Sequence, residues 1–330
     1  MSKKLVLYRF LVVGVIVLFI GVGVQPAFAD VSFKNIGSAG FIQSLINNAS
    51  NGDTIYIPSG TYYEHIDIDK SIYLIGEDKY STIIDGDGDG DIIQVFADFV
   101  EISNFTIQNG DCGILSTANF CKYFKNRVIY NYEGIQLYNS NVYEIGANNN
   151  EVFSNYIVNN WNYGIGIFNF DWTGTRKGSD NLIYNNYLHD NRLGIDIEFG
   201  KNNIVEGNII SDSTTNGMSI WADNSEIISN CFINNKCGIR VGEDSHDVIV
   251  KCNNFIGNEK NADFQSFFLG TFSKRWIRNY WDDWKGFGPK CIYGSLVILV
   301  KIIPPEVKLF PWIERDWFPK YKAYDIEVNL

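Results

Sequence analysis

Residues 186–241 contain three similar segments, NYLHDNRLGIDI (186–197), NIISDSTTNGMSI (208–220) and NCFINNKCGIRV (230–241). Each segment begins with an asparagine and ends in a short apolar stretch that starts at a glycine. The asparagines that open them are 22 residues apart. A fixed period of this length is typical of repeat architectures, in which each repeat forms one coil of a solenoid.

The pattern extends in both directions along the chain. Earlier repeats open at steps of 22, 29 and 31 residues, and a degenerate one follows the third segment after 23 residues. The opening asparagines are Asn104, Asn126, Asn155, Asn186, Asn208, Asn230 and Asn253. Because about 22 residues cannot bury an apolar face alone, the coils must stack on one another.

Within a repeat, apolar and polar residues alternate, as in Ile195-Asp196-Ile197-Glu198, which is the period of a β-strand. The strands are short and end at Asn and Gly, residues that tolerate the backbone conformations of tight corners. Each strand is expected to pair with its equivalent one coil on, ~4.8 Å away. Parallel crossovers are right-handed, so the sequence predicts an all-β, right-handed single-stranded parallel β-helix.

The opening asparagines have a structural explanation in such a fold. If each points inward at a bend, its amide can hydrogen-bond to the next asparagine along the stack, and a buried polar group requires such partners. We therefore interpret them as a structural ladder rather than as sugar contacts.

The first 29 residues resemble a secretory signal. Lys3, Lys4 and Arg9 precede the apolar run 11–24, and Ala27-Phe28-Ala29 offers a cleavage site before the mature chain. An uncleaved N-terminal anchor is the alternative, and it is the only membrane contact that the sequence suggests. Either way the protein is expected to be secreted or extracytoplasmic, in the periplasm or at the cell surface.

The rest of the chain divides into three predicted parts. Residues 30–100 contain an N-terminal cap, with a short amphipathic helix at 42–48, and the first coils. Residues 101–265 are the regular coils, whose two longer repeats place loops at 138–149 and 169–180. Residues 266–330 form a C-terminal cap. Its tryptophans are interpreted as a plug over the open coil end rather than as a carbohydrate platform; they are Trp276, Trp281, Trp284, Trp312 and Trp317.

Charge and cysteine content limit the function further. The net charge of −11 disfavours nucleic acid as a partner, since phosphates require a basic face. Six cysteines in an exported chain permit disulfides, for example between Cys231 and Cys252, which are about one coil apart. Burial as small apolar side chains explains them equally well.

Three segments resemble one known family. The stretch GDTIYIPSGTYYEHIDIDKSIYLIGEDKYSTIIDG (52–86), the NxxGI coils and NYWDDW (279–284) are similar to the NosD-like, pectin-lyase-like β-helix proteins of the CASH group, which bind carbohydrates or hydrolyse sugars. The resemblance implies the β-helix fold over the mature chain. It implies several functions, among them pectate lyases, polygalacturonase-like hydrolases, uronan epimerases, phage depolymerases, non-catalytic surface proteins and copper-maturation accessory proteins.

Direct copper binding is disfavoured because His65, His189 and His246 lie in different repeats and the mature chain has one methionine, Met218. The Asp-Pro-His-Glu segment of uronan epimerases does not occur in the sequence.

The candidate site lies on the outward side of the strands that follow the glycines. Alternation points Asp196 and Glu198 outward, next to Arg240 in a nearby coil, and these three are the candidate catalytic residues. Paired carboxylates can act as acid and base, or as nucleophile, in a hydrolase, whereas a lyase would need a base such as an Arg or Lys. The alternative is that outward polar positions are simply solvated. The candidate substrate-binding residues are Tyr138, Phe168, Asp171, Trp172, Arg176, Lys177 and Trp221.

One acidic run is a candidate calcium site. Asp and Gly alternate through Asp85, Asp87, Asp89 and Asp91, which offers carboxylate oxygens on a pliable backbone. An acidic turn between coils is the alternative. With polysaccharide or surface glycan as the expected partner, the sequence predicts an exported protein that binds or processes extracellular polysaccharide. A non-catalytic surface or adhesion protein is the second prediction, and an accessory protein without direct copper binding is the third.

Overall fold

The computed structural model describes residues 40–140, 146–170, 180–267, 274–301 and 306–328. These ranges belong to one compact unit, Ile36–Leu330. No helix within them is long and apolar enough to cross a membrane. The signal segment predicted at 1–29 lies outside the described residues.

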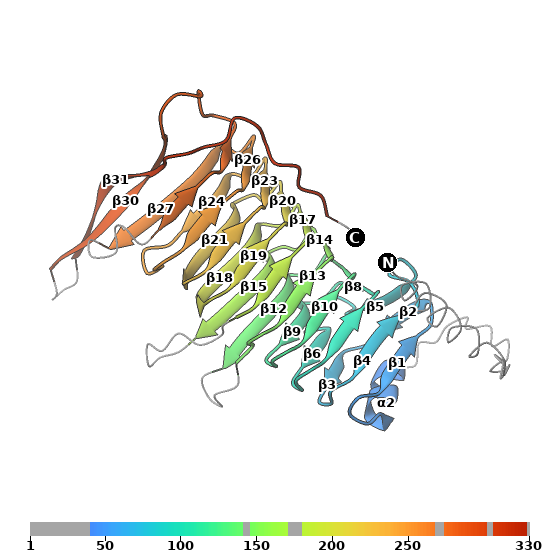
Figure 1. The fold of residues 1–330 in the computed structure, drawn as a ribbon. Coiled ribbons are helices and arrows are strands. Elements are labelled where there is room, and N and C mark those ends of the chain that lie inside the picture. The colour runs from blue at the N-terminus through green and yellow to red at the C-terminus, as the bar shows by residue number, and fades with distance from the viewer. Residues whose placement is uncertain (1–39, 141–145, 171–179, 268–273, 302–305, 329–330) are drawn as a thin grey trace, which may run out of the picture. The chain divides into compact units, whose positions relative to one another are not determined.

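The described chain is a parallel β-helix in which each coil contributes one strand to each of three sheets, so that consecutive coils stack in chain order (Figure 1). Sheet A contains β1 (Thr54–Ile57), β4 (Tyr73–Gly76), β7 (Glu101–Ser103), β10 (Lys122–Phe124), β13 (Glu151–Phe153), β16 (Leu182–Tyr184), β19 (Ile204–Glu206), β22 (Glu226–Ile228), β25 (Ile249–Lys251) and β28 (Arg275–Ile277). Sheet B contains β2 (Gly60–Tyr63), β5 (Thr82–Asp85), β8 (Thr106–Gln108), β11 (Arg127–Ile129), β14 (Tyr156–Val158), β17 (Tyr187–His189), β20 (Ile209–Ser211), β23 (Cys231–Ile233), β26 (Asn254–Ile256) and β29 (Tyr280–Trp281).

Sheet C is different because its middle strands are longer and its last pair is antiparallel. It contains β3 (Ile66–Ile68), β6 (Ile93–Val95), β9 (Cys112–Ser116), β12 (Glu133–Ser140), β15 (Tyr163–Phe170), β18 (Leu193–Lys201), β21 (Asn216–Asp223), β24 (Cys237–Val241), β27 (Lys260–Phe267), β30 (Lys290–Lys301) and β31 (Glu306–Asp316). The predicted all-β fold of stacked coils is confirmed.

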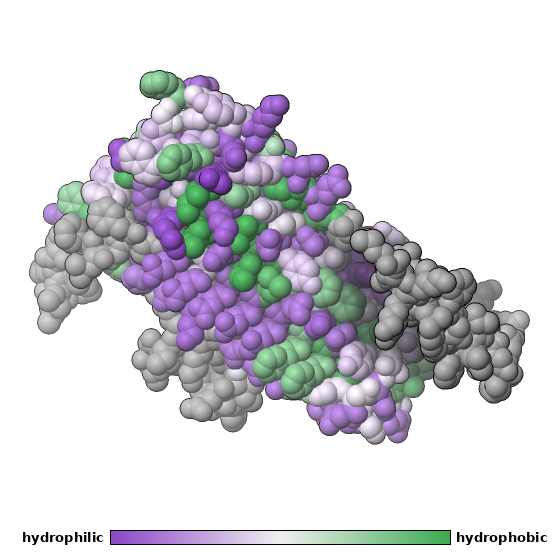
Figure 2. All heavy atoms as spheres, in the orientation of Figure 1, coloured by the Kyte–Doolittle hydropathy of each residue, from purple (hydrophilic) through white to green (hydrophobic). Residues whose placement is uncertain are grey.

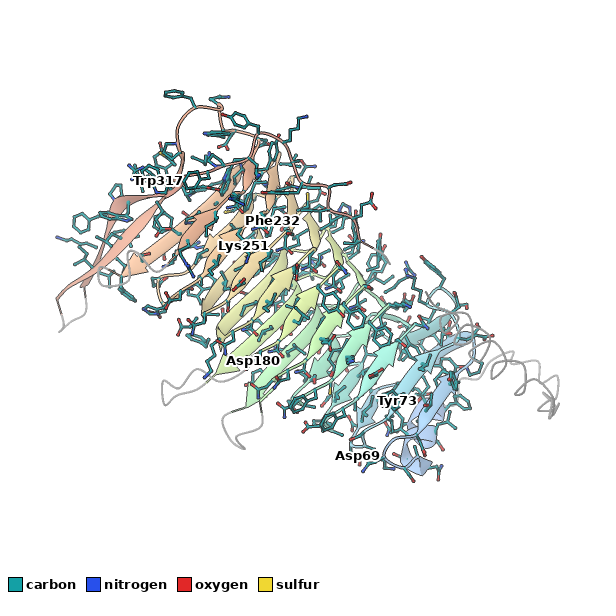
Figure 3. The ribbon with its side chains drawn as sticks, viewed as in Figure 1. Asp69, Tyr73, Asp180, Phe232, Lys251 and Trp317 are labelled. Atoms are coloured by element: carbon teal, nitrogen blue, oxygen red, sulfur yellow. The ribbon has the colours of Figure 1, made fainter. Side chains whose placement is uncertain are left out.

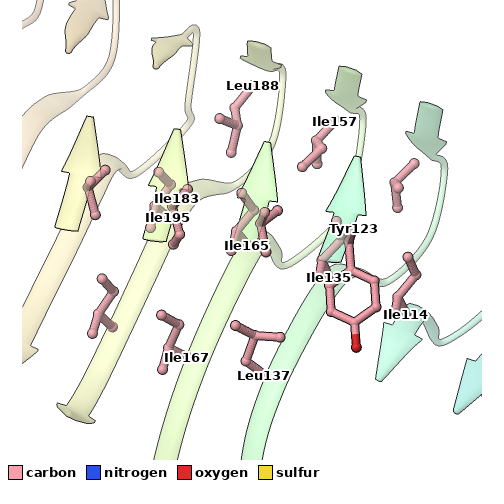
Figure 4. Close-up of a cluster of buried hydrophobic side chains, with 14 of the residues drawn as sticks. Ile114, Tyr123, Ile135, Leu137, Ile157, Ile165, Ile167, Ile183, Leu188 and Ile195 are labelled. Atoms are coloured by element: carbon pink, nitrogen blue, oxygen red, sulfur yellow. The ribbon is translucent and has the colours of Figure 1, made fainter. Parts of the chain in front are cut away.

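Inward side chains form columns of like residues along the stack. In sheet C, Ile135, Ile165 and Ile195 pair in register and are fully buried (Figure 4). Leu137 and Ile167 form a second column beside them. Since every other residue of these strands is apolar, the alternation seen in the sequence separates a continuous core from an outer face. The surface is mixed, with hydrophilic residues over much of the face shown and hydrophobic patches between them (Figure 2).

A column of buried asparagines runs through one bend of the coils. Asn155 N–H donates to Asn186 Oδ1 (3.0 Å), while Asn155 Nδ2 donates to Tyr123 O (2.8 Å) and to Asn186 Oδ1 (3.0 Å). The same arrangement recurs along the stack, so each amide is satisfied by its neighbours in adjacent coils. Its members are Asn126, Asn155, Asn186, Asn208, Asn230, Asn253 and Asn279.

Asn104 does not belong to this ladder, and its assignment was wrong by one residue. Its φ of 64° places it at the left-handed corner that precedes the ladder position. Phe105 occupies that position and its backbone N–H donates to Asn126 Oδ1 (3.1 Å). The ladder also extends one coil beyond Asn253, to Asn279.

The N-terminal end of the coils is covered by α2 (Phe41–Asn48). Ile42 and Ile46 are fully buried, whereas Leu45, expected on the inner face, is 36% exposed. Glu64 accepts hydrogen bonds from the backbone N–H of Ile42 (3.0 Å) and Gln43 (3.2 Å), which satisfies two free donors of the first helical turn.

The C-terminal end is closed by aromatic side chains. Trp276 and Trp281 are buried, and Trp281 stacks on Phe255 with ring centroids 4.3 Å apart. Trp284 and Trp312 are partly buried against the core. Trp317 is 63% exposed near the β31 end of the stack (Figure 3), so it is not part of the plug.

Two predicted details of the coils differ in the structure. The loops placed at 138–149 and 169–180 begin inside strands, because β12 continues to Ser140 and β15 to Phe170. Residues 141–145 and 171–179 lie outside the described residues. Cys231 pairs in register with Asn254, and all six cysteines are free thiols, so Cys231 and Cys252 are not bridged.

Candidate functional site

The outer face of sheet C carries the predicted carboxylates. Asp196 in β18 pairs in register with Gly166 and Ser219, and Glu198 pairs with Phe168 and Trp221. Ile195 and Ile197, which alternate with them, are fully buried. The predicted outward placement of Asp196 and Glu198 is confirmed. It follows from the two-residue period of a strand, because apolar residues that face the core leave the alternate residues on the outer face.

Asp196 lies in an environment that disfavours its ionisation. Its Oδ1 is buried and has no hydrogen-bond partner among the described residues. Burial, and secondarily the charge of Glu198, raises the pKa of Asp196 to about 7, while the charge of Arg192 acts in the opposite direction. Burial also raises the pKa of Glu198. Asp196 is therefore partly a neutral carboxylic acid near pH 7, and such a group can donate a proton.

Two aromatic rings beside Asp196 exclude water from it. Tyr163 and Phe168 approach each other with ring centroids 5.0 Å apart, and both lie over Gly166, the register partner of Asp196. A Cβ atom on Gly166 would lie 2.3 Å from the Phe168 ring and 2.6 Å from the Tyr163 ring, so only glycine leaves room for them. Sequence reasoning did not find Tyr163, because the alternation pattern starts only after Gly164.

Arg240 is matched by a local carboxylate. Its Nε lies 4.0 Å from Asp263 Oδ2, and its guanidinium carbon lies 6.0 Å from the centre of the Trp221 ring. In register it follows Ser219, one coil further from Asp196. Asp263 Oδ1 binds Lys260 Nζ (2.5 Å), and Arg240 Nε is buried without a hydrogen-bond partner among the described residues.

The predicted aromatic positions share one row of sheet C but not one uninterrupted surface. Tyr138 pairs with Phe168, and Glu198 separates Phe168 from Trp221. All three aromatic side chains are partly buried. Trp221 lies against Gly242, and its Nε1 donates to Glu243 Oε2 (3.4 Å). The four remaining candidates, Asp171, Trp172, Arg176 and Lys177, lie outside the described residues.

The acidic run from Asp85 to Asp91 forms a turn and not a metal cluster. Asp85 is buried, and its Oδ2 accepts hydrogen bonds from Gln108 Nε2 (2.7 Å) and Asn109 Nδ2 (2.9 Å) in the next coil. Its Oδ1 accepts the backbone N–H of Asp87 (3.0 Å). Nowhere in the described ranges do three or more His, Cys, Asp or Glu side chains form a group that could hold a metal ion. The four carboxylates predicted to bind calcium, Asp85, Asp87, Asp89 and Asp91, therefore form no such group, and both oxygens of Asp85 bind amides instead.

A hollow that the sequence did not reveal runs along the corner between sheets B and C. It consists of two cavities of about 790 Å³ and 530 Å³ that share Tyr130, Asn159 and Trp161. We call the two cavities together the corner groove. The first is also lined by Tyr63, Asp85, Asp87, Gly88, Asn109, Gly110, Asp111, Asn131 and Tyr132, and the second by Asn160, Asp190, Arg192 and Thr214.

Arg192 connects the corner groove to the carboxylates of sheet C. It lines the second cavity, and its charge lowers the pKa of Asp196 against the effect of burial. Its Nη1 donates to Asn162 Oδ1 (2.9 Å), and Asn162 Nδ2 donates to Glu133 Oε1 (3.2 Å). Asp196 itself lines neither cavity; it follows Arg192 by four residues in the chain, and Arg192 lines the second cavity.

Comparisons with known proteins agree with this architecture. A family model described as a right handed beta helix region matches residues 172–267. The structure resembles the Azotobacter vinelandii mannuronan C-5 epimerase AlgE4 A-module, with a TM-score of 0.52 and 13% identity, over 69% of this chain and 79% of that one.

Two further solved structures are similar. Pectate lyase Pel9A has a TM-score of 0.51 and 15% identity over 73% of this chain and 74% of that one. ORF18 of Geobacillus virus E2 has a TM-score of 0.51 and 18% identity over 78% of this chain and 56% of that one. A search of curated protein sequences found no significant match. At these identities the likeness concerns the fold. The protein is thus a right-handed parallel β-helix protein with the fold that pectate lyases share.

Proposed function

We propose that this protein binds and hydrolyses an extracellular polysaccharide, with Asp196 as the general acid. The observation that carries the proposal is the setting of Asp196. Its carboxyl has a buried oxygen without a hydrogen-bond partner among the described residues, a pKa raised to about 7 and a second carboxyl two residues away, and Arg192, whose charge acts on it, lines the corner groove. Perturbed carboxyls beside a groove are typical of acid–base catalysis.

An inverting hydrolysis is the mechanism proposed for the two carboxyls. Same-face positions two residues apart on a strand are about 6.5–7 Å apart at Cα, and the side-chain conformations set the distance between the carboxyl groups themselves. In this mechanism Asp196 donates its proton to the glycosidic oxygen as the bond from that oxygen to the anomeric carbon breaks. Ionised Glu198 accepts a proton from the water whose oxygen bonds to the anomeric carbon. The products are two shorter chains, one with a new reducing end.

Hydrolysis is better supported than elimination by the described residues. A lyase removes a proton next to a sugar carboxylate and needs a basic side chain free to accept it. Arg240 and Arg192 are guanidinium groups, which keep their protons in proteins and therefore cannot accept another. The neutral carboxyl of Asp196 favours proton donation instead.

Export is part of the proposal. The basic start, the apolar run and the Ala27-Phe28-Ala29 site support cleavage before Asp30 and delivery to the periplasm or the cell surface. Extracellular polysaccharide is available to a protein in that location.

We expect the mature chain, residues 30–330, to release new reducing ends from at least one polysaccharide without forming unsaturated products. The experiment incubates the folded protein with neutral, amino-sugar and uronic polysaccharides and follows both reducing ends and absorbance of unsaturated ends. Hydrolysis produces new reducing ends alone, because water adds a hydrogen to one fragment and a hydroxyl group to the other, so that no double bond forms.

Detection of unsaturated ends would contradict hydrolysis and indicate cleavage by elimination. No product from any polysaccharide, with a protein shown to be folded, would contradict catalysis and favour a non-catalytic surface protein. The accessory role stays a prediction that this screen does not address.

A further inference from the structure

Four aromatic side chains in the corner groove are exposed. Trp161 is 75% exposed, Tyr130 60%, Tyr63 55% and Tyr132 49%. Tyr132 and Trp161 are stacked, with ring centroids 6.0 Å apart. Exposed aromatic rings on a concave surface offer flat apolar faces on which the C–H faces of pyranose rings can pack.

The groove is long enough for an oligosaccharide. Seven consecutive coils each contribute a lining residue between sheet B and sheet C, namely Tyr63, Asp85, Asp111, Tyr132, Trp161, Arg192 and Thr214. At ~4.8 Å per coil the groove extends for about 30 Å. A ligand that follows the stack thus has several sugar units, and one end of the groove contains Arg192, whose charge acts on Asp196.

The charges that line the groove are predominantly negative. Asp87 and Asp111 are exposed, and neither has an ion-pair partner in the described part of the chain. Asp85 accepts hydrogen bonds from two amides, and Asp190 is paired with His189 (2.9 Å). Arg192 is the one lysine or arginine among the residues that line either cavity.

A carboxylate polymer is therefore a poor ligand for this surface. Its charges would face Asp85, Asp87 and Asp111, and like charges repel. Sugar hydroxyl and amino groups can instead donate hydrogen bonds to these carboxylates and to the side chains of Asn109 and Asn159.

We infer that the corner groove binds a polysaccharide whose sugars carry no carboxylate, with Tyr63, Tyr130, Tyr132 and Trp161 as stacking platforms and Asp87 and Asp111 as hydrogen-bond acceptors. The inference rests on the proposed function, for which it names the substrate class. It assigns to this chain a ligand other than the mannuronan and pectate named for the similar structures.

The test compares the binding of soluble β-glucan, chitosan oligomers, polygalacturonate and alginate to the folded mature protein by calorimetry or affinity electrophoresis. We expect the glucan or the chitosan to bind at least tenfold more tightly than either uronate. Trp161→Ala is expected to weaken that binding at least tenfold. Phe287→Ala, which removes a 94% exposed aromatic side chain outside the groove, serves as the matched control and should bind as wild type.

A charge exchange gives an independent readout. The double variant Asp87→Lys, Asp111→Lys should shift preference toward polygalacturonate, because it reverses the sign of the exposed groove charges. Equal or tighter binding of a uronate by wild type, unchanged binding by Trp161→Ala, or no glycan binding at all would overturn the inference. Asp196→Asn separates glycan binding in the groove from hydrolysis by Asp196. This variant should bind the glycan as wild type does, and that result is expected even if no protein tested, wild type included, cleaves the glycan.

Discussion

Replacing Asp196 by asparagine is expected to lower the rate of polysaccharide hydrolysis by about 10²–10⁴-fold. Asparagine has nearly the same shape but cannot donate an acidic proton to the glycosidic oxygen. Glycan binding in the corner groove should stay within about twofold of wild type, since no side chain that lines the groove changes. The measurement is the initial rate of reducing-end formation at pH 6, with binding measured in parallel.

The matched control is Asp67→Asn, which removes an exposed outward carboxylate from β3 of the same sheet. It should hydrolyse as wild type. Asp196→Asn with more than half of the wild-type rate would exclude Asp196 as the acid.

The same substitution has an expected effect on stability that depends on pH. Burial raises the pKa of Asp196 from its ordinary value near 4 to about 7 in the folded state. Folding therefore opposes ionisation of this carboxyl, and the protein loses stability as the pH rises from about 4 to about 7. Asp196→Asn cannot ionise, so its melting temperature should exceed that of wild type at pH 8. At pH 4 the two should agree more closely.

Asp316→Ala is expected to lower the free energy of unfolding by at least about 3 kcal/mol. Asp316 is fully buried at the end of the asparagine ladder. Its Oδ2 accepts hydrogen bonds from Asn279 N (2.8 Å), Asn279 Nδ2 (3.2 Å) and Trp281 Nε1 (3.2 Å), and its Oδ1 accepts from the backbone N–H of Arg278 and Phe318 (both 3.1 Å). Alanine would leave the backbone N–H of Asn279 and the indole N–H of Trp281 buried without this acceptor.

A carboxylate suits this position better than a further asparagine. Each ladder asparagine donates through Nδ2 to the coil before it and to the next Oδ1, so the last one needs an acceptor that has no donors of its own. The measurement is urea unfolding of Asp316→Ala and of the control Trp317→Ala, whose exposed side chain should contribute less than about 1 kcal/mol. A loss below about 1 kcal/mol for Asp316→Ala would contradict this role of the carboxylate.

The repeat predicted the coils and the register of sheet C because a β-strand has a fixed period of two and each coil repeats it. Asn104 shows where the pattern is ambiguous. Asparagine is favourable both inside the ladder and at left-handed corners such as Asn185, whose φ is 53°, so residue type does not separate the two.

A second column of buried asparagines was not predicted. Asn131, Asn160 and Asn191 lie five residues after Asn126, Asn155 and Asn186, and each Oδ1 accepts from the coil before it. The N-x₄-N spacing was visible in the sequence but was not interpreted.

The site was predictable only where it lies on strands. Alternation placed Asp196 and Glu198 outward, but Arg192, Tyr130 and Trp161 lie in corners, next to the second column of asparagines, whose spacing was not interpreted. The corner groove assembles residues from seven coils that are far apart in the sequence. Likewise, Asp85 is satisfied by Gln108 and Asn109 from the next coil, and the composition of the acidic run alone gave no sign of these amides.

The pH dependence of kcat/KM tests hydrolysis by a neutral Asp196 most directly. With the best non-acidic polysaccharide as substrate, the rate of reducing-end formation should pass through a maximum below pH 7. Above about pH 7 it should fall tenfold for each further pH unit, because the pKa of Asp196 is about 7 and only its protonated form donates. A rate that rises through pH 7, as proton abstraction by a base would give, or one that stays constant to pH 9, would contradict the proposal.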